Sequence, residues 1–384
     1  MQRVSIVHLI TGLGTGGAET MLHKLLSRMD RGRFDSVVVS LTDHRGSTIP
    51  IPELGIPVSS CAHGGMLRVI RELRGFRPHL LQGWMYHGNL AAQAMAAALP
   101  ERPAVLWNIR GTHENLSAEK LTTAATIWIG GKFSTLPQRI ISNSTVSARV
   151  HQQKLGYRRD GWVVIPNGFD LERFRPSEKA RAEVRAELGL PDGTLLIGVI
   201  GRYHPLKDHA NFLSAAAILR KTVPEAHFLL VGSGVDQSTA LREQATRSGL
   251  SNCVRMLGER ADMPRLTAAL DIASSSSNSE AFPNVIGEAM SCEVPCAVTD
   301  VGDSAWLVSE TGRNAPARNP EALAKAWEEL CSLGATGRKT LGAAARNRIG
   351  THFSIASVAQ QYEQLYEQVL EPHMNQRGYR PCAA

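Results

Sequence analysis

Two glutamates, Glu280 and Glu288, stand with seven residues between them around a Pro-Asn step that predicts a helix beginning at Asn284. The first N–H groups of that helix, on Asn284, Val285 and Ile286, are expected to point at an anion. A carboxylate on either side can accept hydrogen bonds from hydroxyl groups. This arrangement predicts a ligand with hydroxyls at both ends and an anion in its middle, which is the shape of a nucleotide sugar.

Two basic side chains, Arg202 and Lys207, follow the predicted strand Leu195–Ile200. Arg202 offers a planar fork of N–H groups for phosphate oxygens, and Lys207 adds a point charge at the start of the next helix. The carboxyl end of a parallel strand is where open α/β sheets bind ligands. We therefore expect this pair to bind a diphosphate; charges on a surface loop are the alternative.

A glycine-rich loop that contains Gly16 and Gly17 joins the first predicted strand, Val4–Ile10, to the helix Ala18–Met29. Glycine lets the backbone approach a ligand, and the helix start supplies N–H groups for an anion. The loop differs from a dinucleotide fingerprint because its third glycine is displaced by one residue and no acidic residue closes a second strand. A phosphate or substrate loop and a plain tight turn both remain open.

Strands and helices alternate along the whole chain, which predicts parallel sheets covered by helices. Turn residues at 166–170, followed by a charged stretch with little periodicity, Glu172–Leu188, divide this alternation into two halves. A last helix, Ile355–Glu371, carries an apolar stripe whose partner domain the periodicity alone leaves open. The further predicted strands are Ser36–Leu41, His79–Gln82, Val105–Asn108, Arg139–Ser142, Val163–Ile165, His227–Val231, Val254–Leu257, Ile272–Ser274 and Cys296–Thr299.

The 384 residues suffice for two domains with ample core, and no apolar run reaches the roughly 18 residues that span a bilayer. The six cysteines and thirteen histidines show no metal-ligand spacing, so no metal site and free thiols in a reducing cytosol are expected. Of the net charge of +7, residues 1–165 carry 19 Lys/Arg against 10 Asp/Glu. This basic half predicts an acidic partner, with a solvated surface as the alternative.

Four motifs together resemble the retaining GT-B glycosyltransferases of family four, of the type that builds bacterial polysaccharides. They are the Glu-x7-Glu stretch, residues 201–208, Pro-Asn-Gly-Phe-Asp at 166–170 and Gly-Gly-Ala-Glu at 16–19. The resemblance implies an α/β fold of two Rossmann-like, doubly wound parallel-sheet domains facing across a cleft. Residues 1–168 would bind the acceptor, joined by a C-terminal helix within 353–384, and residues 169–352 would bind the nucleotide sugar.

Site roles follow from this resemblance. Arg202 and Lys207 match the diphosphate-binding pair, Glu280 the contact to the donor sugar and Glu288 the contact to ribose. The helix start at Asn284, Val285 and Ile286, the loop at Gly16 and Gly17, and the pocket residues Gly258 and Glu259 complete the expected donor site. On the acceptor side, Arg110 would bind a phosphate and His113 the donor sugar, with a satisfied loop histidine equally possible. Glu293 departs from the family, which often has glycine at this helix end.

The resemblance implies a retaining hexosyltransferase that needs no metal or other cofactor and takes a UDP- or GDP-linked sugar. The expected acceptor is a glycan or a lipid-linked glycan. The expected location is the cytoplasm, with contact to the anionic inner face of the cell membrane. A non-hydrolysing nucleotide-sugar epimerase and a non-catalytic nucleotide-sugar binding protein are the alternatives. Because aromatic residues are only 5% of the chain, stacking on single-stranded nucleic acid is not expected.

Overall fold

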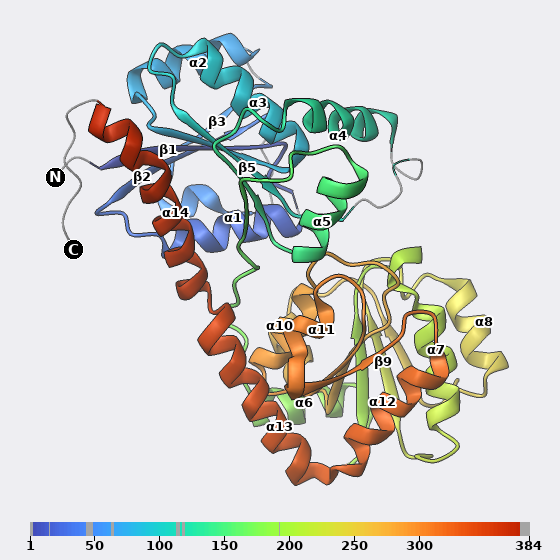
Figure 1. Cartoon of the computed structure of the whole chain (residues 1–384). Coiled ribbons are helices and arrows are strands. Elements are labelled where there is room, and N and C mark those ends of the chain that lie inside the picture. Colours follow the sequence, from blue (N-terminus) through green and yellow to red (C-terminus); the bar gives the residue numbers. More distant parts are fainter. Residues whose placement is uncertain are drawn as a thin grey trace. The chain divides into compact units, whose positions relative to one another are not determined.

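A computed structural model describes residues 3–14, 16–43, 49–62, 65–112, 116, 120–191 and 193–376. The chain divides into two units (Figure 1). Unit 1 comprises Met1–Gly168 and Ile355–Ala384, and unit 2 comprises Phe169–Ser354. Each contains one sheet in which all paired strands are parallel.

Unit 1 has a seven-stranded sheet in the order β3-β2-β1-β4-β5-β6-β7. Its strands are β1 (Val4–Ile10), β2 (Phe34–Ser40), β3 (Val58–Ser60), β4 (Leu80–Trp84), β5 (Ala104–Ile109), β6 (Arg139–Ser142) and β7 (Trp162–Val164). Its α-helices are α1 (Gly17–Arg28), α2 (Gly65–Phe76), α3 (Met85–Ala98), α4 (Leu121–Phe133), α5 (Thr145–Lys154) and α14 (Ile355–Gln376).

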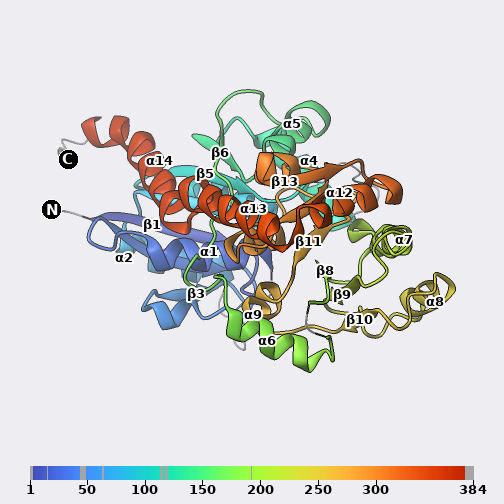
Figure 2. The ribbon, with the colours of Figure 1, turned by 90° about the horizontal axis from the view of Figure 1, so that it is seen from below.

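Apolar side chains cover both faces of the unit 1 sheet. One core layer is formed by α1 and α14, and it includes the buried rings of Tyr362 and Tyr366 from α14. The other layer is formed by α2, α3 and Ile127 of α4. Figures 1 and 2 show α14 beside α1, although more than 300 residues separate them in sequence. The last helix therefore completes the core of unit 1.

Unit 2 has a six-stranded sheet in the order β10-β9-β8-β11-β12-β13. Its strands are β8 (Leu196–Ile200), β9 (His227–Val231), β10 (Val254–Leu257), β11 (Ile272–Ser275), β12 (Cys296–Thr299) and β13 (Gly312–Ala315). Its α-helices are α6 (Glu178–Glu187), α7 (His209–Leu219), α8 (Thr239–Arg247), α9 (Met263–Ala268), α10 (Asn284–Ser291), α11 (Ser304–Val308), α12 (Pro320–Ser332) and α13 (Gly334–Arg348). Residues of α7, α8 and α12 form one core layer, and residues of α6, α9, α10, α11 and α13 form the other.

The two parallel sheets with helices on both faces confirm the predicted doubly wound α/β class. The predicted break at 166–170 coincides with the boundary between the units, but the charged stretch Glu172–Leu188, where no helix was predicted, contains α6. Ser177 caps this helix by accepting a hydrogen bond from the Ala180 N–H at 3.1 Å. A narrow apolar stripe that includes buried Val184 packs α6 against the rest of unit 2. No helix within the described ranges is long and apolar enough to cross a membrane.

Candidate functional site

The strand order of unit 2 fixes where a ligand would bind. Numbered within the unit, the order is 3-2-1-4-5-6, so the chain winds in one direction from β8 to β10 and in the other from β11 to β13. Sheets of this kind bind ligands at the carboxyl ends of the strands, in the crevice where the order reverses. That point lies between β8 and β11, which pair directly through Ile197 and Ile272.

Lys207 and Glu280 meet at this switch point. Lys207 follows β8 and Glu280 follows β11, and the Lys207 ammonium forms an ion pair with Glu280 Oε1. The aliphatic part of Lys207 lies over Gly201, where an added Cβ would stand 3.5 Å from its Cδ. The two side chains are 27% and 15% exposed, so both reach the surface. The structure thus brings together a cation and a carboxylate that are 73 residues apart in sequence.

A run of serines after β11 supports the pair, and the sequence analysis did not single it out as functional. Ser277 donates its hydroxyl to Glu280 Oε1 at 2.8 Å, and Ser276 donates to the Lys207 carbonyl at 2.9 Å. Thr299, at the end of β12, donates to the Ser277 carbonyl at 2.6 Å. The signal for these residues was present, because serine is mostly an exposed residue and here four serines, from 274 to 277, lie at the end of a buried strand.

The backbone beside Glu280 is closely packed. Gly302 has a positive φ of 57°, and an added Cβ would lie 2.2 Å from the Glu280 carbonyl oxygen. The Asp303 N–H donates to the Ala281 carbonyl at 3.1 Å. Only glycine permits this approach, so the loop after β12 holds the backbone of Glu280 in place.

Helix α10 begins at Asn284, at the residue that the sequence predicted. Its N-cap, Pro283, forms no side-chain cap hydrogen bond. The Ile286 N–H donates to the Pro283 carbonyl at 3.2 Å, so this predicted anion donor has a partner within the chain. The anion role of Asn284 and Val285 stays a prediction. Glu288 is half-buried on the same helix face as Asn284, four residues away, and its ribose contact also stays a prediction.

The other predicted donor residues of unit 2 also lie at carboxyl ends of strands. Arg202 is exposed on the loop after β8 that leads to Lys207. Gly258 and Glu259 follow β10, two strands away from β8, which corresponds to about 10 Å across the sheet. An added Cβ at Gly258 would lie 2.9 Å from the carboxylate of Asp236, on the loop after β9. All these residues therefore lie at the end of the unit 2 sheet where its strands have their carboxyl ends.

His209, two residues after Lys207, is buried in the first turn of α7. Burial lowers the pKa of His209 to about 4, and the nearby charge of Lys207 acts in the same direction. The nearby Gly201 backbone and the charge of Asp208 oppose this shift. His209 is therefore neutral at physiological pH and adds no charge to the site.

In unit 1, Gly16 and Gly17 lie at the equivalent switch point, after β1. An added Cβ at Gly16 would lie 2.2 Å from Oε2 of Glu19, whose side chain folds back on the start of α1. Burial raises the pKa of Glu19, and a hydrogen bond to its own backbone opposes the shift. The carboxylate of Glu19 thus lies where the loop was expected to receive an anion. The donor role of both glycines stays a prediction.

Arg110, the predicted acceptor-side residue, follows β5 and has partners within unit 1. Its Nη1 donates to the Tyr362 hydroxyl at 3.0 Å and to Asn108 Oδ1 at 3.3 Å, and its Nη2 donates to Asn167 Oδ1. Burial lowers the pKa of Arg110, and the contacts with Tyr362 oppose the shift. Its phosphate contact stays a prediction, and any phosphate there would share the guanidinium with these oxygens. His113 lies outside the described residues.

Possible metal ligands and the buried thiol of Cys292 complete the description of the reactive side chains. They contain no group of three or more His, Cys, Asp or Glu residues that could hold a metal ion. Burial is the main cause that raises the pKa of Cys292 to about 12, and the charge of Glu288 adds to it. Cys292 is therefore a thiol at neutral pH and a poor nucleophile.

Comparisons with known proteins agree with this geometry. Residues 15–173 match the family model described as Glycosyltransferase Family 4, and residues 194–332 match the one described as Glycosyl transferases group 1. EpsF of Bacillus subtilis (strain 168), which is named as a glycosyltransferase, is 25% identical over 77% of this chain and 79% of EpsF. The D-inositol 3-phosphate glycosyltransferase of Nocardia farcinica (strain IFM 10152) is 34% identical over 45% of this chain and 40% of that enzyme.

Among solved structures, Alr3699/HepE of Anabaena, in complex with UDP and glucose, matches with a TM-score of 0.80 and 23% identity. The match covers 95% of this chain and 100% of that one, and it confirms the predicted fold class of two Rossmann-like domains. The two family models cover both units, and together with the glycosyltransferases among its relatives they show that the chain belongs to the group 1 glycosyltransferases of family four.

Proposed function

We propose that this glycosyltransferase takes a sugar from a UDP- or GDP-linked donor bound at the switch point of unit 2. The observation that carries the proposal is the Lys207–Glu280 ion pair, held by Ser277 between β8 and β11. A diphosphate needs cations, and a sugar needs hydrogen-bond acceptors. The HepE structure, in complex with UDP and glucose, supports a donor of this class.

The chemical difficulty of the reaction is the negative charge that develops on the departing diphosphate. Lys207, Arg202 and the start of α10 would stabilise that charge as preorganised cations and dipoles, without a metal. One such contact is typically worth about 3–4 kcal/mol in the transition state. Glu280 would accept hydrogen bonds from hydroxyls of the donor sugar.

Retention of the anomeric configuration is the proposed outcome. The acceptor oxygen bonds to the anomeric carbon on the face that the diphosphate leaves, the bond from that carbon to phosphate oxygen breaks, and the leaving phosphate takes the acceptor proton. No step requires a protein nucleophile. The proposed acceptor is a glycan or a lipid-linked glycan at the cytoplasmic face of the membrane, in the assembly of cell-surface polysaccharide. The relatedness to EpsF supports transfer chemistry, and the basic charge of residues 1–165 supports the location.

The test incubates the purified protein with UDP- and GDP-linked sugars in the presence of EDTA. Slow release of free nucleoside diphosphate is expected for one donor, whereas sugar isomerisation without release would indicate an epimerase, and neither would indicate a binding protein. Glu280→Gln should slow release about 100-fold. NMR of the transferred product should show the donor's anomeric configuration. Inversion, or activity that EDTA abolishes, would contradict the proposal.

A further inference from the structure

Helix α4 turns its large apolar side chains outward. Leu121 is 88% exposed, Trp128 60% and Phe133 50%, and Ile129 and the following Leu136 are also exposed. With 3.6 residues per turn, one side of this helix carries residues 121, 125, 128, 129, 132 and 133. This set of residues, with Leu136, is called the α4 face below. Exposed apolar groups of this size that gather on one surface mark a site of interaction.

The buried side of α4 explains why these side chains cannot turn inward. Gly130 and Gly131 pack where an added Cβ would lie 2.4 Å from the Tyr157 hydroxyl and 2.7 Å from the Leu155 carbonyl oxygen. The Tyr157 hydroxyl also donates to the Ile127 carbonyl at 3.2 Å. The two glycines let the backbone of α4 lie close to the rest of unit 1, so the large residues of the helix remain on its outer side.

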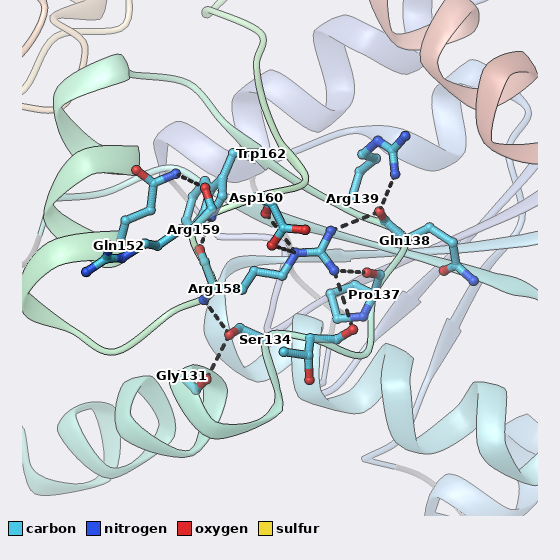
Figure 3. A network of polar contacts seen from close by, with 11 residues as sticks. Gly131, Ser134, Pro137, Gln138, Arg139, Gln152, Arg158, Arg159, Asp160 and Trp162 are labelled. Atoms are coloured by element: carbon cyan, nitrogen blue, oxygen red, sulfur yellow. Dashed lines mark hydrogen bonds and ion pairs between the residues drawn. The ribbon is translucent and has the colours of Figure 1, made fainter.

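Arg158 fixes the end of α4 from the inside (Figure 3). The Arg158 guanidinium donates to the carbonyls of Pro137 at 3.0 Å and Gln138 at 3.2 Å. The backbone N–H of Arg158 donates to the Ser134 hydroxyl at 2.8 Å. Ser134 in turn donates to the Gly131 carbonyl at 2.8 Å. These bonds satisfy backbone carbonyl groups at and just after the end of α4 and anchor that end to the rest of unit 1.

The charged residues on α4 and at its N-cap, Lys132 and Lys120, are both basic. Residues 120–159 contain seven Lys/Arg residues and no Asp or Glu, between Glu119 and Asp160. Lys120 is the N-cap of α4, and the Lys132 ammonium lies 5.5 Å from the Trp128 ring centroid. An apolar helix face with Trp and Lys suits the interface of an anionic bilayer.

A second copy of the chain fits the same surface less well. Pairing two α4 faces would bring Lys120 and Lys132 of one copy toward the same lysines of the other, and like charges in contact cost several kcal/mol. An anionic bilayer offers the opposite charge, and each nearby Lys or Arg adds about 1 kcal/mol to its attraction.

We propose that the α4 face is the surface by which this enzyme docks on an anionic lipid bilayer, with Leu121 and Trp128 entering the acyl boundary and Lys120 and Lys132 facing the headgroups. This inference rests on the proposed function, in which the acceptor lies at the membrane. The test of membrane binding requires neither donor nor acceptor, so its result is independent of the test of sugar transfer.

The chain of 384 residues is sedimented with vesicles of phosphatidylcholine alone and of phosphatidylcholine mixed with phosphatidylglycerol. Wild type should bind the anionic vesicles, and salt should weaken the binding. The double variant Leu121→Ser/Trp128→Ser should lower the partition coefficient about tenfold or more. Lys132→Glu should lower it about tenfold on anionic vesicles. Trp128→Phe, which keeps an apolar ring, should still bind.

Leu333→Ser and Lys325→Glu are matched controls in unit 2, where both side chains are exposed, and both should bind as wild type does. Circular dichroism checks that each variant is folded. The proposal fails if wild type does not bind anionic vesicles, binds neutral ones equally well, or keeps its binding in the double variant. A dimer that the double variant abolishes, without vesicle binding, would make this face a contact between copies and would overturn the proposal.

Discussion

At the scale of single residues, Lys207 and Glu280 show what sequence patterns can and cannot give. Their types and positions after strands pointed to a diphosphate and a sugar. Their ion pair could not be predicted, because it depends on β8 and β11 being neighbours in the sheet. The bond from Ser276 to the Lys207 carbonyl depends on the same adjacency.

His209 makes unit 2 sensitive to acid. Its pKa is about 4 in the folded chain, against an ordinary value near 6.5, so the unfolded chain takes up the proton first. The stability of the neutral state is fully present above about pH 6.5 and is lost as the pH falls toward 4. The free energy of unfolding should fall by about 2 kcal/mol between pH 7.5 and 5 through this residue.

Urea unfolding at the two pH values measures this difference in wild type and in His209→Gln. The variant should lose about 2 kcal/mol less on acidification, whatever its stability at pH 7.5. His352→Gln, at an exposed position, should behave as wild type does. An equal loss of stability in His209→Gln and wild type would show that His209 is not the group responsible.

At the scale of elements, regular apolar periodicity predicted most strands, and the few helices that the sequence analysis named, to within a few residues. Four of the elements that were missed, β3, β13, α4 and α6, lack that signal. β3 and β13 are three and four residues long, and each lies at an edge of its sheet. α6 carries only a narrow apolar stripe, and α4 is apolar on its outer side as well as its inner side. Local pattern therefore fails where packing against the rest of the unit decides the structure.

Glu293, the departure from the family pattern, occupies a strained backbone position after α10. Its φ is 61°, in the left-handed region that favours glycine. Glu293→Gly should raise the free energy of unfolding by about 1 kcal/mol, because a residue other than glycine pays roughly that for this conformation. Thermal unfolding measures the change. Glu225→Gly, in a turn where φ is not positive, should not stabilise the protein. A lower melting temperature for Glu293→Gly would contradict this account.

At the scale of the whole molecule, alternating strands and helices were enough to predict two doubly wound parallel sheets. The chain's return to unit 1 through α14 was not evident from periodicity, because an apolar stripe does not say which surface it covers. The same limit applied to Arg110. Its contacts with Asn167 and Tyr362 link β5 to the last residues before unit 2 and to α14, which no spacing in the sequence reveals.

The central claim is that the donor's diphosphate binds at the switch point of unit 2, at Lys207. Titration calorimetry with UDP and with GDP tests it most directly, on wild type, Lys207→Ala and the control Lys325→Ala. Loss of a charged hydrogen bond to phosphate is worth about 1.5–3 kcal/mol, so Lys207→Ala should weaken binding of the nucleotide that wild type prefers about 10- to 100-fold. Lys325→Ala should bind that nucleotide as wild type does. Equal affinity of wild type and Lys207→Ala for it would contradict the claim.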